Sequence, residues 1–273
     1  MAINDISLTA GMRSNLLQLQ NTTKLTDRTQ ERLSTGKQVN SALDNPTNFF
    51  AAQAHVNRAS DFSVRKDGMA EAIQTTKAAD AGITAISALV EAAKGLAAAA
   101  LGTSSTTDRE AYAAQFDTLL GQIDTLASDS VYRGTNLLGG NNLTVNFNED
   151  ATSNLTVTGF TATSTGLSID AAGTSWTTTT NGGIEDSQKL LDDAANKLRS
   201  EAKNLANNLN IITTRQNFTD AMIGTLQTGA DNLTLADMNQ EGANMLMLQT
   251  RQNLGTTALS LSSQAAQSVL RLF

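Results

Sequence analysis

The chain lacks cysteine and has a single histidine, and these two scarcities remove several classes of active site. With no Cys in 273 residues, disulfides, thiolate nucleophiles and cysteine-ligated metals are excluded. One histidine, His55, cannot form the two-histidine HExxH zinc motif, and no GxxxxGKS/T or GxGxxG loop is present. His55 stands among alanines in a predicted helix, where we interpret it as a surface or interface residue. The sequence therefore favours a protein that is not an enzyme and holds no metal or cofactor.

Aromatic residues, proline and positive charge are also scarce. Aromatics make up 4% of the chain, there is one proline, and Ala, Leu and Gln are abundant, which favours long, closely packed helices. The formal net charge of −7 argues against a nucleic-acid partner, because phosphate binding needs a concentrated basic surface. The N-terminus has neither the basic region nor the apolar core of a cleaved secretory signal, and no segment is expected to span a membrane.

Apolar residues recur every three or four positions on both sides of a different middle region. Such heptad stripes predict long helices that need partner helices along their length. A polar break, GTSSTTD at 102–108, separates the first two stripes. The three stripes are Ile83, Ile86, Val90, Ala93, Ala97 and Ala100; Tyr112, Phe116, Leu119, Ile123 and Leu126; and Leu198, Ala202, Leu205, Leu209, Ile212, Ile223 and Leu226.

The middle region, residues 141–183, reads differently. It has no Lys or Arg, it is rich in Thr, and it alternates apolar and polar residues at 143–147 and 155–157. This alternation predicts short strands or a hairpin, followed by a helix from Ile184. The expected fold class is mainly α: long paired N- and C-terminal helices in a coiled-coil-like rod, with a small β-hairpin region in the middle of the chain.

The two ends of the chain resemble each other. Both are amphipathic and nearly free of charge, and such helices are not stable alone in water. We expect them to cover each other and to need further protein around them; the alternative is a pair of frayed termini. The apolar positions are Leu8, Met12, Leu16 and Leu19 at one end, and Leu254, Ala258, Leu261, Ala265, Val269, Leu272 and Phe273 at the other.

Turn-forming residues gather between two predicted helices in LSTGKQVNSALDNPTNFF, residues 33–50. Gly36 and Asn40 tolerate unusual backbone angles, and Pro46 disfavours helix at Asn45. The stretch could be an active-site loop or a structural joint whose partner is another protein.

The order of these segments resembles bacterial flagellin. The similarity rests on an amphipathic helix followed by LSTGKQVNSALDNPTNFFAAQ and heptad helices, and on the closing NMLMLQTRQNLGTTALSLSSQAAQSVLRLF. It covers roughly residues 1–140 and 184–273. The resemblance implies a subunit that self-assembles into the helical flagellar filament. Residues 1–43 with 232–273 would form its inner layer, and 44–231, including the β-rich 141–183, its outer layer.

The resemblance also assigns a role to the turn-rich stretch. In the family this region joins inner and outer helices and contacts neighbouring subunits, which here implies a joint of Leu33, Gly36, Asn40, Asp44, Asn45 and Pro46. Family members often carry a second acidic residue where this chain has Asn45-Pro46, so the local contacts are expected to differ.

Further expectations follow from the resemblance alone. It implies export without a cleaved signal peptide, a secretion chaperone, contacts with filament cap and hook–filament junction proteins, and an extracellular location. Some flagellins are O-glycosylated, and the candidates here are Thr161, Thr163, Thr165, Thr177 and Thr178. The stretch that a vertebrate innate receptor binds in many flagellins aligns with Ala92, Lys94, Gly95 and Leu96, where the family's arginines and glutamate are missing.

Two alternatives remain within the structural class. A hook–filament junction protein has similar terminal helices, and a soluble coiled-coil adaptor would share the heptads. Long uniform filaments in electron micrographs of the assembled protein would favour flagellin over both.

Overall fold

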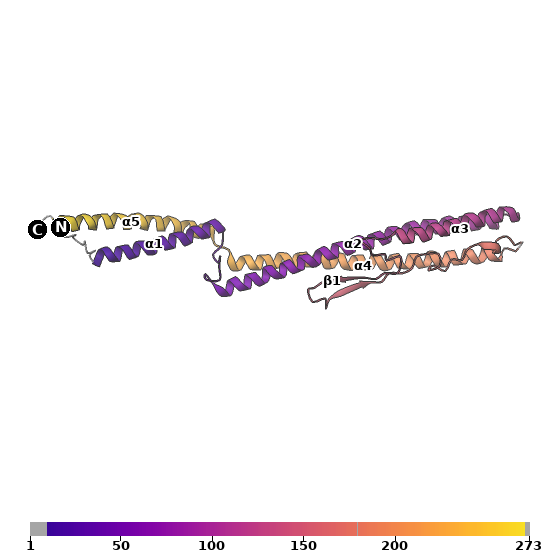
Figure 1. Ribbon diagram of the computed structural model, residues 1–273, viewed down its shortest axis with the longest axis horizontal. Helices are drawn as coiled ribbons and strands as arrows, with labels where there is room; N and C mark the ends of the chain where they lie inside the picture. The colour runs from indigo at the N-terminus through magenta and orange to yellow at the C-terminus, as the bar shows by residue number, and fades with distance from the viewer. Residues whose placement is uncertain (1–9, 179, 271–273) are drawn as a thin grey trace, which may run out of the picture. The chain divides into compact units, whose positions relative to one another are not determined.

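The computed structural model describes residues 10–178 and 180–270. In this part of the chain the elements are long helices with one small sheet and one short 3₁₀ helix (Figure 1). They are α1 (Ala10–Thr35), α2 (Pro46–Leu101), α3 (Thr106–Asp129), β1 (Leu143–Asn146), β2 (Asn154–Val157), η1 (Gly173–Ser175), α4 (Gly182–Thr234) and α5 (Met238–Leu270). The mainly α fold with a small antiparallel sheet confirms the fold class.

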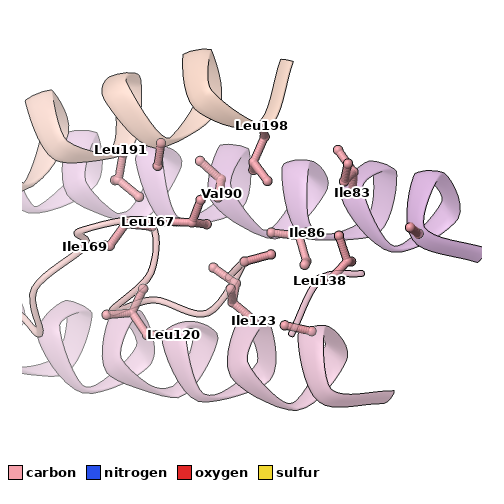
Figure 2. Close-up of a cluster of buried hydrophobic side chains, with 14 of the residues drawn as sticks. Ile83, Ile86, Val90, Leu120, Ile123, Leu138, Leu167, Ile169, Leu191 and Leu198 are labelled. Carbon is pink, nitrogen blue, oxygen red and sulfur yellow. The ribbon is translucent and has the colours of Figure 1, made fainter. Parts of the chain in front are cut away.

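The chain forms two compact units. One, the terminal unit, contains the described residues up to Arg58 and from Thr225 onward. The other, the central unit, is Ala59–Gly224. Helices α2 and α4 each contribute to both units. In the terminal unit α1 lies alongside α5 (Figure 1). In the central unit α3 lies along α2, and the two helices share one apolar core (Figure 2).

The central unit has a continuous apolar core between α2, α3 and α4. Ile83, Ile86 and Val90 of α2 are buried and face side chains of α3 and α4 (Figure 2). The whole α2 stripe predicted from the sequence is buried. In α3 the buried face is shifted from the prediction. Phe116 and Ile123 are buried as expected, but Ala113, Leu120 and Ala127 complete the core, while Tyr112, Leu119 and Leu126 are only partly buried.

The end of α2 and the start of α3 confirm the polar break that the sequence shows at residues 102–108. α2 ends at Leu101, immediately before Gly102, and Ser105 caps the next helix by accepting a hydrogen bond from Asp108 N–H at 3.3 Å. This cap satisfies one of the amide groups that the first turn of a helix leaves without a partner.

The middle region contains the predicted hairpin and little other regular structure. β1 and β2 pair antiparallel, with Val145 opposite Leu155. Beyond β2 the chain is mostly irregular but not superficial, because apolar side chains such as Leu167 and Ile169 enter the helical core (Figure 2). Trp176 is fully buried, with its ring centroid 4.7 Å from that of Phe116 and its Nε1 donating to Ser187 Oγ at 3.0 Å. The irregular segment therefore completes the core.

Helix α2 departs from the expectation that no segment is long and apolar enough to span a membrane. Among the described residues, α2 contains an 18-residue window with a mean hydropathy of 1.4, long and apolar enough to cross a membrane. A third of that window (33%) is buried inside the protein. The physical reason is its alanine content, since alanine raises the mean hydropathy while its small side chain serves close helix packing. The core helix of a water-soluble bundle passes the same test, so the window is weak support for a span.

Candidate functional site: the terminal helix pair and its turn

The α1–α5 contact is unusually polar for a helix pair. On α1 its buried positions are Met12, Thr22 and Thr29, and on α5 they include Leu248. Thr22 satisfies its hydroxyl by donating to the Gln18 carbonyl at 2.9 Å. Fully burying an apolar side chain contributes roughly 1.5–3 kcal/mol. With few such residues, this pair gains much less from burial than the central core does.

A buried ion pair links the two helices. Arg32 Nη1 lies 2.9 Å from Glu241 Oε1, and the side chains are 15% and 8% exposed, respectively. The guanidinium supplies the counter-charge that a buried carboxylate needs. Close packing continues along the pair, because a Cβ at Gly255 would lie 3.2 Å from Leu19 Cδ1.

The largest apolar side chains of the pair point away from it. Leu254 and Leu261 are 65% and 61% exposed, so the expectation that these residues cover the N-terminal helix is wrong. The reason is helical phase: the face of α5 that meets α1 contains Leu248 and Gly255, and Leu254 precedes Gly255 by one residue, about 100° around the helix. Other large side chains of the two helices are also exposed: Leu16, Leu17, Leu25, Leu246 and Met247.

The remaining predicted positions of the terminal helices divide between the two faces. Leu19 and Ala258 are half-buried, and Leu16 and Ala265 are exposed. Leu8, Leu272, Phe273 and the side chain of Val269 lie outside the described residues.

The turn after α1 is tied to the end of α4. Gly36 has a φ of +70°, a left-handed conformation that favours glycine, and its N–H donates to the Arg32 carbonyl at 2.8 Å, which ends the helix. Its carbonyl accepts from Ala236 N–H at 3.0 Å, and the Thr234 carbonyl accepts from Gln38 N–H at 2.7 Å. These bonds place the end of α1 beside the link between α4 and α5. Leu33, in the last turn of α1, is half-buried.

Asp44 organises the next turn. Its Oδ2 accepts from the backbone N–H groups of Ser41 at 3.0 Å and Asn40 at 3.1 Å and from the Ser41 hydroxyl at 3.2 Å. The Ser41 N–H is the largest cause of a lowered pKa at Asp44, with the Asn40 N–H adding to it. The turn holds Leu43 at 96% exposure. A leucine held this way gains nothing from folding of the isolated chain.

The start of α2 explains both Asn45 and Pro46. Asn45 Oδ1 accepts from Asn48 N–H at 3.1 Å, which is an N-cap, and Pro46 takes the first helical position. A proline has no N–H, and the first position has no carbonyl to receive one, so this is where proline is least costly. Phe50, one turn into α2, is largely exposed.

The predicted receptor-equivalent residues lie together on α2 in the central unit. Lys94 Nζ is 2.7 Å from Asp192 Oδ1 on α4, and this hydrogen bond is the largest cause of a raised pKa at Lys94. Ala92 and Leu96 line a shallow hollow of about 420 Å³ together with Leu119 of α3. Gly95 is exposed.

The candidate glycosylation sites differ in accessibility. Thr161, Thr165 and Thr178 are exposed, whereas Thr163 and Thr177 are half-buried. The Thr177 and Thr178 hydroxyls donate to the Thr174 and Ser175 carbonyls at 2.9 and 3.1 Å.

Sequence reasoning missed the exposed Leu43, Phe50 and Leu17. A leucine at the centre of a polar turn and two adjacent leucines on an amphipathic helix were available signals, since one of two neighbours must leave the apolar stripe. It also missed Arg109, a buried arginine at the start of α3. Its position after a polar loop gave no sign of burial.

The single histidine, His55, is half-buried, and a Cβ at Gly229 would lie 3.7 Å from its ring.

The fold and this surface define a mainly helical structural protein whose terminal pair presents apolar side chains outward. Comparison with known proteins identifies the family. The family model for the bacterial flagellin N-terminal helical region matches residues 3–143. The flagellins FljM and FljK of Caulobacter vibrioides are 32% and 30% identical to the chain, each over 100% of both proteins. A flagellin of Brucella melitensis is 27% identical over 99% of this chain and 97% of that one.

Among solved structures, a Bacillus cereus flagellin aligns with 56% of this chain and 88% of its own, at 20% identity and a TM-score of 0.47. The chain belongs to the bacterial flagellin family. It is a structural subunit that self-assembles into the extracellular flagellar filament, as the resemblance in its sequence predicts.

Proposed function

We propose that the outward leucines of the terminal unit are the contacts through which neighbouring subunits polymerise. The supporting observation is that Leu254 and Leu261 are exposed on α5. Between Gly242 and Ser268 this helix has one charged residue, Arg251. Exposed leucines on a nearly uncharged helix mark a protein-lined environment. Ordering a helix costs about 1–2 kcal/mol per residue in backbone entropy, so stable ordering of α1 and α5 is coupled to polymerisation.

Removal of Ser260–Phe273 tests this mechanism. The central unit keeps its own core, so the truncated chain retains strong helical circular dichroism but forms no filaments in electron micrographs. Leu261→Asp has the same effect on assembly, because an unpaired carboxylate would be buried in every stacked subunit. Ala111→Asp is the matched control, since Ala111 is exposed on α3 of the central unit. Normal filaments from the truncated chain would contradict the proposal.

The turn at residues 36–46 acts as an inter-subunit joint. Leu43, Phe50 and Leu235 are exposed apolar residues of the turn, of α2 and of the link that follows α4. Gly36→Val tests the joint. No atom lies within 4 Å of a Cβ there, so the first side-chain carbon causes no clash, and the φ of +70° makes backbone strain the expected effect. It should permit export but slow or distort assembly. Gly36→Asn is the control, because asparagine tolerates the left-handed region better than a β-branched residue. Equal assembly by the two variants contradicts this role.

The inner filament layer comprises residues 1–43 with 232–273, and the outer layer 44–231. About forty residues form the middle region, enough for the hairpin and its extended continuation but not for a large outer domain. The filament is therefore slender and smooth. A density map of the filament with a large projection per subunit would contradict this arrangement.

Export proceeds without a cleaved signal, and a secretion chaperone covers the apolar C-terminal face in the cytoplasm. The exposed leucines of α5 support this partner, and the filament cap and hook–filament junction proteins are the expected contacts at the filament ends. Chaperone binding measured by calorimetry should be lost on removal of residues 232–273. Undiminished binding would reject the assignment.

O-glycosylation is proposed at the exposed Thr161, Thr165 and Thr178 ahead of the half-buried Thr163 and Thr177. Intact mass of protein from native filaments tests it, because agreement with the sequence mass excludes the modification.

Weak activation of the vertebrate innate receptor is also proposed. Only Lys94 keeps a positive charge in the aligned stretch, and it is engaged by Asp192. Lysine cannot replace the planar hydrogen-bonding group of arginine. A receptor-reporter potency equal to that of a flagellin with the full motif contradicts the proposal.

A further inference from the structure

Arg109 is a buried cation whose hydrogen bonds all go to neutral oxygens. Only 4% of the surface of this residue is exposed. Nε donates to the Thr103 carbonyl at 2.9 Å, Nη1 to the Thr178 carbonyl at 2.9 Å, and Nη2 to Asn181 Oδ1 at 2.6 Å. No ion pair to it is formed by the acidic residues that the structure describes. Buried arginines normally have a carboxylate partner, so the charge of Arg109 lacks its usual complement.

The side chain in the carboxylate's place belongs to the one Asn-Gly pair of the chain, Asn181-Gly182. Asn-Gly is chemically labile because the amide nitrogen of the following residue can attack the asparagine Cγ, and glycine has no side chain to obstruct the attack. Gly182 is the first residue of α4, where helix geometry provides no carbonyl for its N–H. A Cβ at Gly182 would meet no atom within 4 Å, so an alanine fits at this position without a clash.

Arg109 is placed to assist that attack. Since arginine is only a donor, the asparagine atom it contacts at 2.6 Å must be the carbonyl oxygen. Attack at Cγ puts negative charge on this oxygen, and a cation already hydrogen-bonded to it stabilises the charge as it develops. The same contact orients the Asn181 side chain at the N-terminus of α4.

The product would also be stabilised by its surroundings. An aspartate at 181 would give Arg109 a charge-assisted hydrogen bond in place of a neutral one. It would also place a carboxylate at the positive end of the α4 helix dipole. Both effects favour the carboxylate over the amide in the folded chain.

We propose that Asn181 is a self-modification site that deamidates to aspartate with the assistance of Arg109. The Gly182 nitrogen forms a bond to Asn181 Cγ and loses its proton, the Cγ–Nδ2 bond breaks, and ammonia leaves. Water then adds to the resulting cyclic imide and opens it to aspartate or its isoaspartyl isomer. Water is the only co-reactant, and no oxidation or reduction occurs. The modification adds one negative charge per subunit and gives the buried Arg109, in the first turn of α3, an ion-pair partner at the exposed residue 181, immediately before α4.

The test is a time course on the purified full-length chain at mildly alkaline pH, followed by peptide fragmentation in a mass spectrometer. Replacement of NH₂ by OH should accumulate at residue 181 and not at Asn142, an exposed asparagine followed by leucine. Gly182→Ala, which the open space accommodates, should stop the conversion. Arg109→Met should slow it about tenfold or more, since each 1.36 kcal/mol of lost transition-state stabilisation is a factor of ten.

Circular dichroism of each variant establishes that it is folded, and Arg109→Gln, which removes the charge but keeps a hydrogen-bond donor, replaces Arg109→Met if the latter is not. Conversion at Asn181 no faster than at Asn142 overturns the proposal. A rate unchanged in a folded Arg109 variant overturns the role of the guanidinium.

Discussion

Removing one partner of the Arg32–Glu241 pair should weaken the terminal unit far more than removing one partner of an exposed pair. Glu241→Gln leaves the shape of the contact intact but takes the counter-charge away from Arg32, and Arg32→Met leaves Glu241 unpaired. Both side chains are mostly buried, with 15% and 8% of their surface exposed.

The magnitude follows from this burial. Breaking a fully buried ion pair by removing one partner costs about 3–5 kcal/mol. Because Arg32 retains some contact with solvent, which screens the uncompensated charge, we expect about 2 kcal/mol for either single substitution. If the terminal helices order on polymerisation, this raises the critical concentration for filament formation about 30-fold, since 1.4 kcal/mol is a factor of ten.

The assay is sedimentation of filaments over a range of total protein concentrations, which gives the critical concentration of each variant. The Arg32→Met/Glu241→Gln double variant should recover part of the loss, and the double-mutant cycle isolates the coupling between the two groups. Asp220→Asn is the control. Its pair with Lys66 is shorter, 2.7 Å against 2.9 Å, but the Asp220 side chain is 64% exposed, so the change should be within a few tenths of a kcal/mol. A loss in Glu241→Gln or Arg32→Met no larger than the loss in this control would refute the reasoning from burial.

Three further predictions concern single residues. Leu261→Asp should abolish filaments while leaving helical circular dichroism intact, and filaments of normal length would contradict it. Trp176→Phe removes the hydrogen bond to Ser187 and should lower the urea-measured stability of the central unit by about 1–3 kcal/mol; a change below about 0.5 kcal/mol would show that the bond is not needed. The folded pKa of Asp44 is depressed, chiefly by the N–H of Ser41, so its contribution to the turn is present above the ordinary value of 3.8 and is lost as the pH falls below it, through the lowered pKa. NMR titration of the Ser41 amide checks this, and a midpoint at or above 3.8 contradicts it.

The sequence predicts the helical scaffold well because its signals are local and repeated. The α2 stripe from Ile83 to Ala100 is buried as its spacing indicates, and Gly36 and Pro46 end and begin helices through their own backbone chemistry. The β-hairpin follows from alternation around Val145 in the same way.

Positions whose environment depends on distant residues were not predictable in this way. Leu261 belongs to an amphipathic pattern, but which side of α5 meets α1 depends on where the two helices cross, and the pattern alone gave the wrong answer. Ile169 lies in a Thr-rich segment without periodicity, so its entry into the core could not be read from local sequence. The physical reason is that a hydrophobic stripe indicates which side chains prefer burial, but it does not indicate which surface buries them.

By itself, then, the sequence determined the helices, their breaks, the hairpin and membership of the flagellin family, because each of these depends on neighbouring residues or on an order of segments along the chain. Tertiary structure alone decided which leucines of α5 remain exposed, and it alone brought Arg109 against Asn181, 72 residues away in the chain. Contacts of this kind arise when separate elements pack, and a buried charge acquires its partners only in the folded chain.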